Sequence, residues 1–257
     1  MHFLVRWVVD NWIARRSAQK LRGKHLASRV AGSPSAAATV EQGTTTVDLY
    51  SYFLTQQGRR IIKNTHFFVV YERFFRQFVN TPVLMFEIGT GDGGSAQMWK
   101  HYFGPMARIV TIDIRDCKEF EESQIYARIG SQRDPEFLRA LVAEFGTPDI
   151  ANDDGSHLMA DVHASFETLY PLMSPRGVYV IDDLNTAYFE EFGGGFKKPG
   201  SFIERCKNLV DELNAPWTRT LRRPSSHAPR FSISFFDSMV VVERGMVNKE
   251  LLYLPHR

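Results

Sequence analysis

A strand pattern that breaks into glycines constrains the fold of this chain most strongly, and it covers residues 83–95. The run reads VLMFEIGTGDGGS, with four glycines between positions 89 and 94. Apolar residues at helical spacing follow at Met98, Trp99 and Tyr102. Glycine allows positive φ and lets a ligand approach the bare backbone, and a helix N-terminus offers free N–H groups. The run therefore predicts a buried strand, a tight turn and a helix start at a ligand site.

The spacing of this turn is Glu87-x-Gly89-x-Gly91-x-Gly93, which differs from the dinucleotide-binding pattern Gly-x-Gly-x-x-Gly. A second strand pattern ends at Asp113. An acid about 20 residues after a glycine turn, at a strand tip, is placed to bind ribose hydroxyls. The alternative is an Asp that caps a turn. The two features together favour a nucleoside site.

Length and composition exclude several classes of protein. The 257 residues fit one large domain, or one domain with an extension. The net charge of +2 gives no reason to expect a nucleic-acid partner. The two cysteines, Cys117 and Cys206, have no metal-ligand spacing and fit a reducing compartment such as the cytoplasm. No apolar run approaches the length of a membrane-spanning helix.

The first 46 residues differ from the rest in composition. Residues 1–30 combine an apolar cluster with a following set of basic residues, which predicts a basic and apolar helix. Through residues 2–30 such a helix could contact an anionic membrane surface peripherally. Packing on the domain or on a sister subunit of a homo-oligomer is the alternative, and an organelle transit peptide is a third. Residues 31–46 are small and polar and predict a linker, so the folded domain is expected at 47–257.

Helix and strand patterns alternate through the expected domain. Helices are predicted at 47–57, 61–79, 95–103, 134–145, 159–172 and 200–214, and strands at 83–88, 108–113, 125–129, 148–152 and 177–181. Two further runs, at 231–236 and 239–243, predict an antiparallel hairpin. The chain is therefore expected to be an α/β protein with a doubly wound, Rossmann-like sheet. That sheet is mainly parallel, with N-terminal helices and a C-terminal antiparallel hairpin.

Polar residues follow each predicted parallel strand at its carboxyl end. They are Glu87 with the glycine turn, Asp113, Gly130–Gln132, Asp153–His157 and Asp182–Thr186. The carboxyl ends of parallel strands share one edge of the sheet, and ligands bind beyond that edge. We therefore expect these clusters to form one crevice.

Three acids of this edge, Asp154, Asp182 and Asp183, could bind a hard divalent cation. Oxygen ligands without cysteine suit Mg²⁺, Mn²⁺ or Ca²⁺. Without a cation, carboxylates packed together repel one another and raise their own pKa values. The alternative is that the paired acids cap the following helices. His157 lies close to Asp154 in the sequence and is a candidate general base, with an ordinary loop residue as the alternative.

The chain contains a series of short motifs, which are FEIGTGDGGS (86–95), MW (98–99), YFGP (102–105), IDI (112–114), IGSQ (129–132), DDGSH (153–157), YPL (170–172) and DDL (182–184). Together and in this order they resemble those of the metal-dependent sugar O-methyltransferases of the macrocin and mycinamicin type. The cephalosporin hydroxylase-like proteins are a related group. The resemblance runs from about residue 50 to residue 245. It implies the fold of a class I S-adenosylmethionine-dependent methyltransferase.

The resemblance also implies a role for each motif. The cofactor-binding residues would be Glu87, Gly89 and Gly91 on the methionine side, Asp113 at the ribose, Ser131 and Gln132 near the adenine, and Asp153. Asp154, Asp182 and Asp183 would bind Mg²⁺, and His157 would be the catalytic base. The activity implied is methyl transfer to a sugar hydroxyl of a glycosylated natural product, a polysaccharide or a glycolipid.

Three positions depart from the family pattern. Asn152 stands in a central strand where aliphatic residues are usual, Asp182 replaces a Glu, and Asn185 replaces a His. Two other functions therefore stay open: a related-fold, hydroxylase-like enzyme with iron at His157 and the carboxylates, and a non-catalytic, membrane-associated nucleoside-binding protein. The glycine-rich loop Phe192–Gly200 could cover the acceptor, and a plain surface loop is the alternative.

Overall fold

The structure is a computed structural model, and it describes residues 48–218, 220 and 231–245. The helix predicted at 1–30 and the linker predicted at 31–46 lie outside the described residues, so both stay predictions. Within the described ranges, no helix is both long enough and apolar enough to cross a bilayer.

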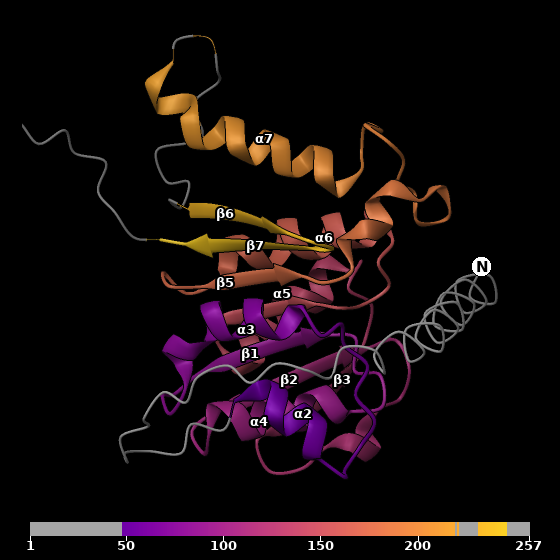
Figure 1. Ribbon diagram of the computed structural model, residues 1–257, viewed down its shortest axis with the longest axis vertical. Coiled ribbons are helices and arrows are strands. Elements are labelled where there is room, and N and C mark those ends of the chain that lie inside the picture. Colours follow the sequence, from indigo (N-terminus) through magenta and orange to yellow (C-terminus); the bar gives the residue numbers. More distant parts are fainter. Residues whose placement is uncertain (1–47, 219, 221–230, 246–257) are drawn as a thin grey trace, which may run out of the picture. The chain divides into compact units, whose positions relative to one another are not determined.

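A seven-stranded sheet forms the centre of the described domain, with the strand order β3-β2-β1-β4-β5-β7-β6 (Figure 1). The strands are β1 Leu84–Ile88, β2 Arg108–Asp113, β3 Ile125–Ile129, β4 Ile150–Asp153, β5 Val178–Ile181, β6 Phe231–Phe236 and β7 Met239–Arg244. The first five are parallel, whereas β7 runs antiparallel to both β5 and β6. The predicted mainly parallel, doubly wound sheet with a C-terminal hairpin is therefore confirmed.

Helices cover both faces of this sheet (Figure 1). They are α2 Leu49–Thr55, α3 Phe67–Phe75, α4 Gly94–Phe103, α5 Pro135–Phe145, α6 Met159–Leu169 and α7 Phe202–Asn214. Buried side chains of α2, α3 and α4 form one core with Met85 and Ile109 of the sheet. Those of α5, α6 and α7 form a second core with Phe86 and Val110. Successive strand residues point to opposite faces, so neighbours in β1 and β2 serve different cores.

The same alternation sorts the polar residues of the sheet. Glu87 of β1 and Asn152 of β4 are paired across the sheet. Each lies two residues after a member of the α2–α4 core, Met85 and Ile150 respectively, so both point to that face. Asp153 comes one residue later and points to the opposite face, where α6 lies. The sheet therefore separates the side chain of Asp153 from those of Glu87 and Asn152.

The helix predicted at 61–79 is wrong in its first third, because residues 61–66 are not helical and α3 begins at Phe67. The cause lies in two side chains of this segment. Lys63 reaches Asp154 and Asp182, and Asn64 reaches Asp183. These contacts replace one more turn of helix, whose gain in free energy is small. The other predicted elements are confirmed, with ends that shift by at most three residues.

Phe75 tests the packing of α3. It is fully buried and contacts the rings of Tyr71, Trp99 and Phe103. The change Phe75→Ala should lower the free energy of unfolding by about 3–5 kcal/mol, because it removes buried apolar area and leaves a cavity. Urea denaturation followed by fluorescence measures the loss. Phe196 is 80% exposed, so Phe196→Ala is the control and should change the value by less than about 0.5 kcal/mol. Equal effects would contradict the packing described.

Candidate active site

The glycine turn after β1 is closed on one side and open on the other. Gly89 has φ +94°, and a Cβ there would lie 2.2 Å from the carbonyl oxygen of Asp154, so a larger residue would clash with the loop after β4. Gly91 has φ +57°, and nothing lies within 4 Å of its Cβ position. A ligand can therefore approach the backbone at Gly91 and the N-terminus of α4.

Glu87 lies beneath this turn and is fully buried. The indole N–H of Trp99 donates a hydrogen bond to Oε1 at 2.8 Å. The other oxygen, Oε2, is buried without a hydrogen-bond partner among the described residues. Burial raises the pKa of Glu87 to about 7, although Lys63 and the side chains of Trp99 and Ser95 act in the opposite direction. Glu87 therefore offers a carboxylate oxygen at the glycine turn that makes no close hydrogen bond.

Asp113, at the end of β2, is paired with Arg115. The backbone N–H of Arg115 donates to Asp113 Oδ1 at 3.0 Å, and its Nη2 donates to Oδ2 at 3.1 Å. The same Nη2 atom donates to the carbonyl oxygen of Gly91 at 3.0 Å. Arg115 therefore links the predicted ribose-binding acid to the glycine turn, and no motif in the sequence singles it out.

Asp153 and Gln132 face the α6 side of the sheet and bind each other. The carboxylate of Asp153 accepts hydrogen bonds from Gln132 Nε2 at 3.0 Å, from Ser165 and from Tyr179. Gln132 Oε1 accepts from the backbone N–H of Ser156 at 2.9 Å. Burial raises the pKa of Asp153 to about 6. This bonding braces the loop after β4 against α6, and a direct contact of Asp153 or Gln132 with a cofactor stays a prediction.

Ser131 lies nearby in the turn after β3. Its hydroxyl oxygen accepts a hydrogen bond from the backbone N–H of Arg133 at 3.1 Å, and its carbonyl oxygen accepts from the N–H of Asp134 at 3.0 Å. Ser131 therefore shapes the turn that leads into α5. The predicted contact with an adenine stays a prediction.

Asp154, His157 and Asp183 come together on the carboxyl edge of the sheet, with ligand atoms that all lie within 4.8 Å of one another. Nε2 of His157 is 3.8 Å from Asp154 Oδ1. The backbones of His157 and Asp183 both adopt the left-handed region, with φ +58° and φ +53°. Such conformations cost about 1–3 kcal/mol each and are concentrated at functional sites. The surrounding structure therefore holds two strained residues in this cluster.

Asp182, the third predicted metal ligand, is bound mainly by protein groups. Its Oδ2 atom accepts hydrogen bonds from Lys63 Nζ at 2.7 Å, from Tyr71 and from Asn152 Nδ2 at 3.3 Å. Lys63 Nζ also lies 2.7 Å from Asp154 Oδ2. The unusual Asn in a central strand thus finds a buried partner in Asp182.

Electrostatics favour the charged form of Lys63. Burial alone would lower the pKa of Lys63, but the carboxylates of Asp154 and Asp182 raise it well above its ordinary value. Burial raises the pKa of Asp182 above its ordinary value, although Lys63 acts in the opposite direction. The buried lysine is therefore an ammonium ion beside two acids.

The residues present fit a divalent cation. Carboxylate oxygens and an imidazole converge, and Asp183 Oδ1 is oriented by Asn64 Nδ2 at 3.2 Å. Asp182 Oδ1 is buried without a hydrogen-bond partner among the described residues. A buried carboxylate oxygen that lacks a partner is costly unless a cation or donor satisfies it. The carboxylate oxygens match hard divalent cations, whereas an imidazole is a ligand that softer metals prefer.

Sequence reasoning missed Lys63, Asn64 and Arg115. One signal could have found the first two. The aromatic stripe of the predicted helix begins only at Phe67, so the six residues before it lack a helical core face. A lysine and an asparagine in such a segment are free to reach a site.

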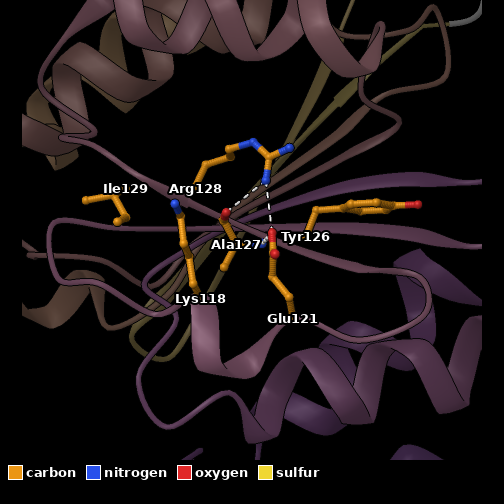
Figure 2. Close-up of a pocket in the computed structure, with 6 residues that line it drawn as sticks. All are labelled: Lys118, Glu121, Tyr126, Ala127, Arg128 and Ile129. Carbon is orange, nitrogen blue, oxygen red and sulfur yellow. Dashed lines mark hydrogen bonds and ion pairs between the residues drawn. The ribbon is translucent and has the colours of Figure 1, made fainter.

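A separate hollow lies at the free edge of the sheet, where β3 is the last strand (Figure 2). Lys118, Glu121 and Arg128 line it with β3 residues 126–129. Arg128 is paired with Glu121 at 3.0 Å and also binds Glu144. None of these side chains belongs to the acidic cluster. Two of the charged side chains that line the hollow, Glu121 and Arg128, are paired with each other.

Comparisons with known proteins agree with the fold and the motifs. No family model matches the chain. The chain is 34% identical over 249 residues to demethylmacrocin O-methyltransferase of Streptomyces fradiae, covering 88% of this chain and 60% of that protein. It is 35% identical over 185 residues to an 8-demethyl-8-alpha-L-rhamnosyl tetracenomycin-C 2'-O-methyltransferase of Streptomyces olivaceus, covering 68% and 49%. The solved MycE methyltransferase of the mycinamycin biosynthetic pathway, in complex with Mg and SAH, superimposes with a TM-score of 0.70. That match has 31% identity and covers 84% of this chain and 58% of MycE.

The chain has the class I methyltransferase fold and is related to the macrocin- and mycinamicin-type O-methyltransferases. The predicted fold and the stated resemblance are thereby confirmed. The chain spans between about half and three fifths of the length of these relatives.

The buried carboxylate of Glu87 predicts a pH dependence of stability. Its pKa is higher in the folded than in the unfolded chain, so its contribution is present at low pH and is lost as the pH rises through about 7. The change Glu87→Gln removes this pH-dependent loss of stability. The free energy of unfolding of the variant minus that of the unchanged chain should therefore grow by on the order of 3 kcal/mol between pH 5 and pH 8. Urea denaturation without metal or cofactor measures this, and parallel pH curves would contradict it.

Proposed function

We propose that this chain is an S-adenosylmethionine- and Mg²⁺-dependent O-methyltransferase that acts on a sugar hydroxyl. The contact between the glycine turn and the acidic cluster carries the proposal. The Cβ position of Gly89 lies 2.2 Å from the carbonyl oxygen of Asp154, so the two half-sites share a wall. A donor at the turn and an acceptor at the acids would meet at that wall, and such proximity is a main source of rate enhancement.

The donor half-site has the features that the cofactor requires. Gly91 leaves the backbone accessible, and Glu87 has a buried oxygen without a partner in the described chain. Asp113 lies beside them with Arg115, whose exposed side chain can move aside for a ribose. MycE, the solved relative, carries SAH together with Mg. These observations support binding of S-adenosylmethionine at Glu87, Gly89, Gly91 and Asp113.

The acceptor half-site supplies the base. Asp154, Asp182 and Asp183 would hold the cation. When bound, Mg²⁺ lowers the pKa of a hydroxyl and S-adenosylmethionine supplies an electrophilic methyl group. His157, as the tautomer protonated on Nδ1, accepts the hydroxyl proton on Nε2. Asp154 Oδ1, 3.8 Å away, stabilises the imidazolium that forms.

Exposed aromatic side chains follow the acidic cluster in the chain and suit the acceptor. Tyr188 is 50% exposed, Phe189 42% and Phe196 80%, and all lie within fourteen residues of Asp183. Such side chains bind the apolar face of a sugar or its aglycone. The acceptor is therefore a glycosylated natural product, a polysaccharide or a glycolipid, with Phe192–Gly200 as its cover. We also propose that the enzyme is cytoplasmic and that residues 2–30 contact a membrane peripherally. We propose further that the chain forms a homo-oligomer.

A hydroxylase-like enzyme is the second candidate, because one imidazole and two carboxylates converge in the cluster and could hold iron. Metal analysis of the purified protein separates the two, since iron at one equivalent would favour hydroxylation. Calorimetry with S-adenosylhomocysteine, with and without Mg²⁺, tests the main proposal. We expect binding that Mg²⁺ does not abolish, and the absence of any binding would overturn the methyltransferase assignment.

The base assignment predicts a separation of catalysis from binding. His157→Ala should lower kcat for methyl transfer by about 10²–10⁴-fold, because it removes the proton acceptor. The affinity for S-adenosylhomocysteine, measured by calorimetry, should change by less than about threefold, because the ring does not belong to the donor half-site. His101→Ala is the control on α4, where the ring stacks on Tyr52. Equal loss of activity and cofactor binding would contradict the role of His157.

A further inference from the structure

The acidic cluster contains a built-in cation. Lys63 is buried, and its ammonium lies 2.7 Å from both Asp154 Oδ2 and Asp182 Oδ2. It also lies 5.6 Å above the ring of Tyr71. Each of the two acids therefore gives one oxygen to Lys63. Lys63 does not bind the other two oxygens: Asp154 Oδ1 lies 3.8 Å from His157, and Asp182 Oδ1 is buried without a partner among the described residues.

The position of Lys63 is fixed by the segment that carries it. Residues 56–66, which we name the strap, connect α2 to α3 without helical structure. Arg60 pairs with Asp92 of the glycine turn, and the carbonyl oxygen of Arg60 lies 2.3 Å from the Cβ position of Gly94. On the other side of Lys63, Asn64 binds Asp183. The ammonium is thus held in place from both sides, unlike a surface lysine.

The charges of this cluster have a simple sum. Asp154 and Asp183 of the cluster, together with Asp182, which lies beside it on Lys63, contribute three negative charges, and Lys63 contributes one positive charge. The remainder is two negative charges, which a single divalent cation neutralises. Without Lys63 the same cluster would carry three negative charges and would suit a trivalent cation better, because the interaction of buried charges scales with their product.

We propose that Lys63 determines the charge selectivity of the cation site, as an internal counter-ion that makes the site match a divalent ion. The proposal rests on the cation site of the proposed function and goes beyond it, since it assigns a specificity-determining role to a residue outside the family motifs. Lys63 also stabilises the metal-free protein, because it compensates the buried carboxylate of Asp182 and the half-buried carboxylate of Asp154, which would otherwise repel each other. Bound cation and Lys63 share these carboxylates.

Binding of Tb³⁺ and Ca²⁺ tests the proposal, because the two ions have similar radii and differ in charge. The dissociation constants of both are measured for the full chain at pH 7, by Tb³⁺ luminescence excited through nearby aromatic rings and by Ca²⁺ competition. In Lys63→Met both ions should bind more tightly, and the preference for Tb³⁺ over Ca²⁺ should rise by more than about tenfold. An unchanged or lower preference in folded Lys63→Met overturns the proposal.

Three further variants keep the test decisive. Lys63→Arg keeps the charge and should leave the preference within about threefold. Lys207→Met makes the same substitution at an exposed position of α7 and should have no effect. Asn64→Asp adds a negative charge beside Asp183 at a half-buried position, so it should raise the preference even where Lys63→Met fails to fold. An unchanged preference in Asn64→Asp would then overturn the proposal.

Two failures are distinguishable in this design. If the unchanged chain binds neither ion, the cation site itself is absent, and the proposed Mg²⁺ dependence fails together with the role of Lys63. If the unchanged chain binds Ca²⁺ but its variants keep the same preference, only the role of Lys63 fails. Loss of S-adenosylhomocysteine binding would affect the proposed function alone, since the cation measurements do not involve the cofactor.

Discussion

The buried ion pairs of Lys63 with Asp154 and Asp182 are the interaction on which the candidate site depends. The carboxylates follow neighbouring strands; Asp182 is fully buried and Asp154 is half-buried, and an uncompensated buried ion costs several kcal/mol. The ammonium at 2.7 Å from both offsets much of that cost. It also determines the local backbone, because the chain before α3 must leave the helix for Lys63 to reach these acids. A single side chain thus connects the fold of the strap with the charge of the site.

The two-residue periodicity of the strands decides which polar groups can act together. Glu87 and Asn152 point to the α2–α4 face, where Trp99 and Asp182 bind them. Asp153 points to the other face and is held by α6. Although Asp153 and Asp154 are adjacent, the first braces the loop after β4 and the second faces the site. Burial raises the pKa of Asp153, although hydrogen bonds from Ser165 and Gln132 act in the opposite direction.

The departures from the family pattern have a partial structural explanation. Asn152 donates to Asp182 and so supports the acid that replaces the usual Glu. Asn185 lies two residues beyond Asp183, and its side-chain oxygen is buried without a partner among the described residues. The first substitution belongs to the network around Lys63, and nothing in the structure explains the second.

The sequence by itself determined the order of strands and helices, the glycine turn and the clustering of acids at one edge. These features depend on local periodicity, on glycine backbone freedom and on the shared direction of parallel strands, all of which can be read from neighbouring residues. Only the tertiary structure decided that residues 61–66 leave the helix and that Arg115 bridges Asp113 and Gly91. It also decided that Lys63 binds Asp154 and Asp182, and that Asp154, His157 and Asp183 converge. Those outcomes depend on side chains that are 24 to 119 residues apart in the chain. The energy of their contacts arises from burial and charge in three dimensions, which no local pattern records.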